Sequence, residues 1–106
     1  MASYATINFN YRKAINQAAK LEDLANDLKR IANRDVEGAL DQVAGSWKGD
    51  SSRLFLQKGE KAKGDLLRSA TQLQNTANAI RKAAENVRRA EIRAKQIADA
   101  IASRNK

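Results

Sequence analysis

The chain has 106 residues, of which 20 are basic and 12 acidic, and it contains no cysteine, histidine or proline. The lack of Cys and His removes disulfides, thiol nucleophiles, the usual zinc ligands and imidazole acid–base chemistry. A chain of this length forms one small domain, and without proline its helices can run almost uninterrupted.

The N-terminal segment predicts an extended arm, because residues 6–11 alternate apolar and polar side chains. Asn8 or Asn10 would then cap the helix that follows. The first ten residues lack a basic start followed by an apolar stretch, so we expect no cleaved signal peptide. No apolar run approaches the roughly 20 residues of a membrane span, so we expect a soluble protein without stable membrane insertion.

A first helix is predicted from about residue 11 to residue 44. Two apolar series run along it, one of large side chains spaced 3-4-3 and one of alanines spaced by seven; they are Leu21, Leu24, Leu28 and Ile31, and Ala18, Ala25, Ala32 and Ala39. Asp35 interrupts the pattern, and Val36, Leu40 and Val43 resume it in shifted phase. That slip indicates a local stutter within the helix rather than its end.

A turn is predicted over residues 45–51, with Gly45 ending the first helix and Asp50, Ser51 or Ser52 capping the second. Trp47, the one tryptophan of the chain, lies here, two residues before Gly49. From physics alone, Trp47 reads as an aromatic plug that closes the end of the hairpin core, with Gly49 permitting the turn.

A second helix is predicted from about residue 52 to residue 102. One large and one small position recur every seven residues; they are Leu66, Leu73, Ile80, Val87, Ala94 and Ile101, and Ala70, Ala77, Ala84, Glu91 and Ala98. The fold class is therefore all-α, a two-helix antiparallel hairpin, with Leu21, Leu24, Leu28, Ile31, Leu66, Leu73 and Ile80 as packing residues. Folding back about the turn places Tyr11 opposite roughly residue 85, which leaves an overhang of about 20 residues.

So small a hairpin buries little surface, which favours self-association or a partner. The positive charge lies in the second half, since residues 1–51 balance at seven basic and seven acidic, whereas residues 52–106 hold thirteen basic and five acidic. This excess is either a solvated helix face or a surface for an acidic protein, nucleic acid or anionic lipid.

The helical hairpin with Trp47, Lys48 and Gly49 at its turn, followed by Phe55 in helix two, resembles the WXG family, the ESAT-like small proteins of bacterial type VII (ESX) secretion. The family's C-terminal Tyr-X-X-X-Asp/Glu element is absent, because Tyr4 and Tyr11 are both N-terminal. A broader family pattern is matched in part by Val87, Glu91, Ala94 and Ala98. Alternatively, Glu91 is a surface carboxylate paired with Arg88 or Lys95.

The resemblance implies dimerisation into an antiparallel four-helix bundle. The partner would be a second copy, a related small helical protein, or the helical N-terminal region of an effector. It further implies export by the type VII secretion ATPase from a cytoplasmic pool, without a cleaved signal. The Trp-X-Gly turn of one subunit and the C-terminal element of the other would form a composite signal, in an export substrate or a co-secreted helper.

No catalytic constellation is visible, so we expect no enzyme, no cofactor and no metal. The serines have no histidine to activate them, and Glu22, Asp23 and Asp27 read as a solvated face. The alternative function is a basic helical nucleic-acid-binding protein, based on a cluster in helix two made of Arg81, Lys82, Arg88, Arg89, Arg93 and Lys95. Nucleic acid is not the expected partner, because Glu85 and Glu91 interrupt this cluster and no aromatic is interleaved. A membrane-surface helix ranks behind it, because the stripe is mostly alanine.

Overall fold

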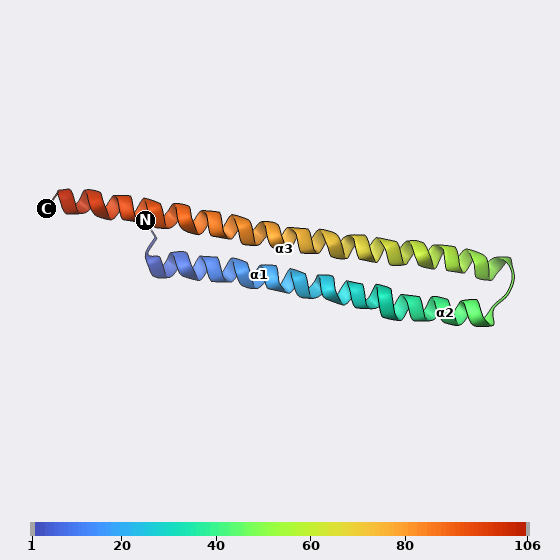
Figure 1. The fold of residues 1–106 in the computed structure, drawn as a ribbon. Helices are drawn as coiled ribbons and strands as arrows, with labels where there is room; N and C mark the ends of the chain where they lie inside the picture. Colours follow the sequence, from blue (N-terminus) through green and yellow to red (C-terminus); the bar gives the residue numbers. More distant parts are fainter. Residues whose placement is uncertain (1, 106) are drawn as a thin grey trace. The chain divides into compact units, whose positions relative to one another are not determined.

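The computed structural model describes residues 2–105 and confirms the predicted fold class, a two-helix antiparallel hairpin (Figure 1). The first arm comprises α1 (Tyr4–Arg30), a π-helix, η1 (Ile31–Val36), and α2 (Glu37–Ser46). The second arm is a single helix, α3 (Asp50–Arg104). The chain divides into two compact units, residues 1–20 with 76–106 and residues 21–75.

The first helix begins at Tyr4, so the prediction of an extended arm over residues 6–11 was wrong. Ser3 caps this helix, because its Oγ accepts a hydrogen bond from the Thr6 backbone N–H at 3.1 Å, a role predicted for Asn8 or Asn10. Ile7 and Tyr11 lie four residues apart and therefore share a helix face, on which Ile7 is buried. The apolar residues of segment 6–11 fit both the alternation of an extended arm and the spacing of a helix, so the pattern did not distinguish an arm from a helix.

The predicted stutter in the first helix is confirmed as the π-helix η1. Its signature is the Glu37 backbone N–H, which donates to the Ala32 carbonyl five residues back. This wider turn accommodates one extra residue, so the buried position moves from the heptad residue Ala39, which is exposed, to Leu40, which is 4% exposed.

In the unit of residues 21–75, small side chains form the contact between the two arms. Ala25, Ala32 and Ala70 are fully buried. The Leu40 side chain packs directly against Gly59, so closely that a Cβ added at Gly59 would overlap it. We call this line of contact the alanine seam. In the other unit, Ala18 and Ala77 are fully buried as well.

Polar side chains bridge the two arms within this unit. Gln74 donates to Glu22 at 3.0 Å. Lys63 Nζ donates to Glu37 at 2.8 Å, and that hydrogen bond raises the pKa of Lys63.

The large apolar residues predicted to pack are less buried than the alanines. Leu21, Leu28, Leu66 and Leu73 are half-buried, as is Ile80 in the other unit. Leu24 and Ile31 are 52% and 40% exposed. Leu21, Leu24, Leu28 and Ile31 thus form a leucine stripe on the first arm that the second arm covers incompletely.

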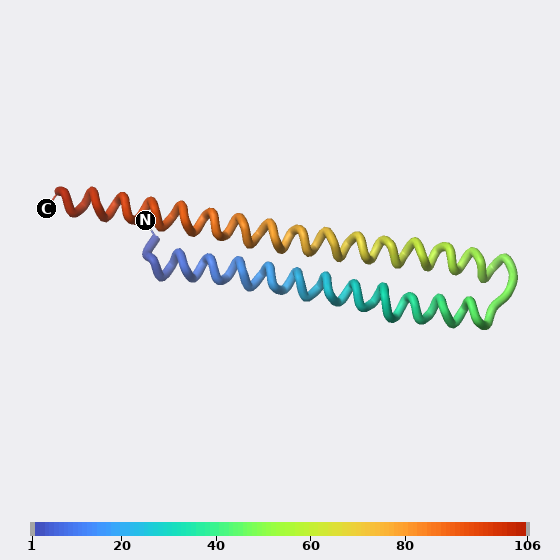
Figure 2. The backbone as a smooth tube through the Cα atoms, viewed as in Figure 1, coloured from blue at the N-terminus to red at the C-terminus, as the bar shows by residue number. Residues whose placement is uncertain are grey.

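In the unit of residues 1–20 and 76–106, two N-terminal tyrosines meet basic residues of α3. The Arg88 guanidinium lies 3.8 Å from the centre of the Tyr11 ring, and Lys95 Nζ lies 5.0 Å from that of Tyr4. The backbone trace shows α3 continuing past the start of α1 (Figure 2). Tyr4, the first residue of α1, contacts Lys95 of α3. The part of α3 that extends past α1 is therefore shorter than the predicted 20 or so residues.

Candidate functional site

The first candidate site is the turn, which comprises Trp47, Lys48 and Gly49. Trp47 ends α2 in an extended backbone conformation, and its N–H still donates to the Val43 carbonyl at 2.9 Å. Gly49 has a φ of +106°, a conformation that favours glycine. Gly45, predicted to end the first helix, lies inside α2 instead, so the turn's left-handed residue is the glycine of the Trp-X-Gly motif.

Helix α3 begins directly after Gly49. The Gly49 carbonyl accepts hydrogen bonds from the Arg53 backbone N–H at 3.2 Å and from Ser52 Oγ at 2.8 Å, with Ser52 largely buried. Asp50 lies in the first turn of α3, where its carboxylate meets the positive end of the helix dipole, and it forms an ion pair with Arg53. The motif glycine thus both reverses the chain and anchors the next helix.

Trp47 and Phe55 lie side by side at the turn. Their ring centroids are 6.1 Å apart with an interplanar angle of 53°, a geometry in which aromatic rings attract. Trp47 is nevertheless 56% exposed and Phe55 46% exposed. In the single chain Trp47 is therefore a largely exposed aromatic in contact with Phe55, so as a plug it would close the end of the hairpin core only in part.

The second candidate site is the C-terminal element, Val87, Glu91, Ala94 and Ala98, on α3 in the other unit. Val87 and Ala94 are exposed, whereas Glu91 and Ala98 are half-buried. Ile97 and Ile101, which follow on the same helix, are 54% and 51% exposed. This part of α3 therefore carries an apolar surface that includes one carboxylate.

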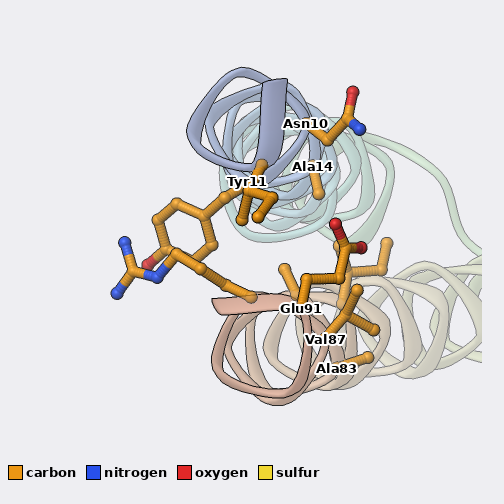
Figure 3. A pocket seen from close by; sticks show the side chains of 10 residues that line it. Asn10, Tyr11, Ala14, Ala83, Val87 and Glu91 are labelled. Carbon is orange, nitrogen blue, oxygen red and sulfur yellow. The ribbon is translucent and has the colours of Figure 1, made fainter. Parts of the chain in front are cut away.

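Val87 and Glu91 line a hollow of about 280 Å³ between α1 and α3 (Figure 3). Its remaining walls are largely apolar and include Ile7, Ala14 and Ile80. Glu91 extends from α3 toward α1 at this hollow, as the close-up shows. The arrangement suits an apolar group that arrives together with a hydrogen-bond donor or a cation.

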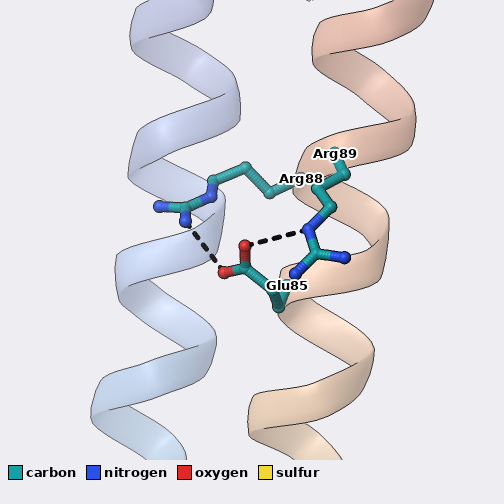
Figure 4. Close-up of polar contacts among 3 residues, drawn as sticks. All are labelled: Glu85, Arg88 and Arg89. Carbon is teal, nitrogen blue, oxygen red and sulfur yellow. Dashed lines mark hydrogen bonds and ion pairs between the residues drawn. The ribbon is translucent and has the colours of Figure 1, made fainter.

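The predicted pairing of Glu91 with Arg88 or Lys95 was wrong. Arg88 donates to Glu85 at 2.8 Å, and Figure 4 shows its side chain reaching toward α1, where it lies over Tyr11. Lys95 pairs with Asp99 at 3.4 Å. Within residues 2–105, Glu91 has no hydrogen bond or ion pair.

Glu85 has two cationic partners, since Arg89 also donates to it at 3.3 Å. The hydrogen bond from Arg88 is the main cause that lowers the pKa of Glu85. Glu85, Arg88 and Tyr11 thus link α3 to α1. Sequence reasoning missed the role of Tyr11, although the predicted fold-back had already placed it opposite roughly residue 85.

The part of the chain that the structure describes contains no cluster of acidic side chains arranged to hold a metal ion. None of its helices combines the length and the apolar character needed to cross a bilayer. Compared with known proteins, the chain matches no protein-family model, no curated protein and no solved structure.

Proposed function

We propose that this protein is a small non-enzymatic component of a bacterial type VII (ESX-like) secretion system, either an export substrate or a co-secreted helper. The observation that carries the proposal is the turn. A Trp-X-Gly motif reverses a helical hairpin, its glycine has a positive φ, and its tryptophan lies exposed against Phe55. An exposed aromatic pair at a hydrogen-bonded turn is a surface that another protein can recognise.

The incompletely covered leucine stripe supports dimerisation as part of this function. Among the described residues, no large side chain is fully buried, so the apolar surface for a stable core is not provided by the hairpin alone. A second helical hairpin packed on the leucine stripe would complete a four-helix bundle. The partner would be a second copy, a related small protein or the helical N-terminal region of an effector.

The alternative function, nucleic-acid binding through the basic cluster of α3, has less support. Arg88 and Arg89 are paired with Glu85, and Lys95 is paired with Asp99. Phosphate contacts would have to compete with these internal ion pairs. We therefore propose the secretion function alone.

The test is export from a host with and without the type VII ATPase. Wild-type protein is expected in the culture supernatant only when the ATPase is present. The double variant Trp47→Ala, Gly49→Ala is expected to remain in the cells, because it removes the exposed ring and the residue suited to the positive φ. Immunoblots of supernatant and cell fractions, with a cytoplasmic marker for lysis, provide the measurement.

Leu54→Ala is the matched control, because Leu54 is 53% exposed near the same turn but outside the motif. It is expected to be exported like wild type. Circular dichroism of each purified variant establishes that the helices are retained. Equal amounts of wild-type protein in both supernatants, or normal export of the double variant, would contradict the proposal.

A further inference from the structure

Glu91 differs from the other half-buried carboxylates of the described chain in having no partner. Glu22 accepts a hydrogen bond from Gln74, Glu37 pairs with Lys63, and Glu85 pairs with Arg88 and Arg89. Arg88 and Lys95, the two cations spaced three or four residues from Glu91, are engaged with other groups. The carboxylate oxygens of Glu91 are not buried, so they are accessible to a cation that arrives from outside.

The surroundings of Glu91 define what else must arrive with that cation. The hollow beside it is walled by Ile7, Ala14, Ile80 and Val87. It lies between two antiparallel helices, where a third helix packs by placing side chains into the groove. An apolar side chain in the hollow and a basic side chain one turn away are adjacent on the surface of an α-helix.

We infer that this hollow binds an α-helix of a different protein chain, whose apolar stripe carries one lysine or arginine that pairs with Glu91. Apolar side chains of that helix would pack between Ile80 and Val87 of α3 and Ala14 of α1. Its basic residue would supply the donor that Glu91 lacks within residues 2–105.

The charge of the chain favours a different protein over a second copy as the source of that helix. The net charge is +8, and all of this excess lies in residues 52–106, which include Glu91. A second copy that brought its own α3 to this surface would bring the same positive charge and be repelled, and one that brought its electrically balanced first arm would add no attraction. A partner helix with an acidic exterior would be attracted by the positive surface of this chain. One basic residue in its apolar stripe would pair with Glu91.

This inference rests on the proposed function in that it specifies the chemistry of the partner helix, but its test involves no secretion and can fail independently. The probes are three labelled helical peptides about four heptads long. They share an alanine–leucine stripe and an acidic exterior, and they differ at one stripe position, which is lysine, norleucine or glutamate. Norleucine keeps the length of lysine without its charge. Binding to the full chain is measured by fluorescence anisotropy.

The lysine peptide is expected to bind wild type about tenfold more tightly than the norleucine peptide, as expected for a charge-assisted hydrogen bond in a partly buried site. Glu91→Gln removes this preference, whereas Glu60→Gln, which changes an exposed carboxylate of the other unit, keeps it. Glu91→Lys reverses the preference in favour of the glutamate peptide. Chemical shifts of the Ile80 and Val87 methyl groups report whether the peptide occupies the hollow.

Several outcomes would overturn the inference. Absence of binding by all three peptides would show that the hollow is no helix-binding surface. An equal lysine preference in wild type and Glu91→Gln would place the cation elsewhere. Self-association of the wild type in sedimentation experiments, lost in Glu91→Gln but kept in Glu60→Gln, would identify a second copy as the occupant and reject a different chain.

Discussion

At the residue scale, the contact between the arms depends on side chains that are small or absent. Ala25, Ala32 and Ala70 have no exposed surface, and Gly59 lies directly against Leu40. Heptad spacing predicted the alanines of this seam, because a period of seven keeps them on one helix face. It did not predict Gly59, whose position matters only because the π-helix moves Leu40 onto the same face.

Gly59→Ala and Gly64→Ala should have different effects on stability. Both replace a glycine inside α3, which by helix propensity alone stabilises by about 1 kcal/mol. A Cβ at Gly64 meets the Arg68 guanidinium at 3.6 Å, an ordinary contact, whereas a Cβ at Gly59 overlaps the buried Leu40 side chain. We expect Gly64→Ala to raise the free energy of unfolding in urea and Gly59→Ala to lower it by about 1–3 kcal/mol, the usual cost of overpacking.

Adding Leu40→Ala to Gly59→Ala supplies the check on this explanation. Gly59→Ala should cost less in a Leu40→Ala background, because the overlap is gone, and a double-mutant cycle measures the difference. Equal effects of Gly59→Ala with and without Leu40 would show that the two residues are not coupled.

At the scale of elements, η1 corrects the phase of the first arm. The seam residues Ala25 and Ala32 are seven apart, whereas Ala32 and Leu40 are eight apart. The π turn absorbs that extra residue, so that Leu40 rather than Ala39 faces α3. The phase shift was readable from the positions of Val36, Leu40 and Val43, but the sequence did not specify how the helix accommodates it.

Deletion of Asn33 should convert η1 into ordinary α-helix with little loss of stability. The deletion removes one exposed residue and restores a spacing of seven between Ala32 and Leu40. We expect the free energy of unfolding to change by less than about 1 kcal/mol, the scale of a surface substitution. In the variant the Glu37 N–H to Ala32 carbonyl hydrogen bond is kept but spans four residues instead of five, and NMR chemical shifts of the surrounding backbone should become those of regular α-helix.

The matched control is deletion of Asn26, an exposed residue in the regular part of α1. This deletion moves Asn33 into the place of Ala32, so a larger polar side chain meets a close-packed contact. It should destabilise by about 2 kcal/mol or more. Similar losses in the two deletion variants would argue against a corrective role for η1.

Ion pairing was harder to predict than packing. The predicted pairing of Glu91 relied on spacing along one helix, where Arg88 and Lys95 are both in reach. The structure engages these cations with Glu85 and Asp99 on α3 and with Tyr11 and Tyr4 on α1. Local spacing along one helix does not reveal competition from a second helix. For the same reason, only the structure showed that Glu91 has no partner within residues 2–105.

At the scale of the whole molecule, the two apolar series of the first arm have different roles. The alanines make the contact between the arms, whereas the leucine stripe lies partly exposed. Predicting the hairpin required the apolar periodicity of both arms and the turn signals of residues 45–51. Assigning the large residues to its core was only partly right, because small residues occupy the closest contact and displace the larger ones to its margin.

The two series should respond differently to substitution in the dilute single chain. Leu24→Ser combined with Ile31→Ser changes side chains that are 52% and 40% exposed, so we expect a loss of at most about 1 kcal/mol. Ala25→Leu places a large side chain at a position with no exposed surface and should destabilise by about 1–3 kcal/mol. Urea denaturation at several protein concentrations measures both and separates folding from association. A larger loss from the double serine variant would contradict the assignment of these roles.

The separation of the alanine seam from the leucine stripe has an evolutionary consequence. If the leucine stripe binds the partner, as proposed, mutations in the stripe would alter which protein the hairpin accepts while the hairpin itself continues to form. Gene duplicates can therefore diverge in partner choice through a few large side chains, with the alanines held constant. A set of such hairpins in one genome would then share the spacing of their small residues and differ most at positions equivalent to Leu24 and Ile31.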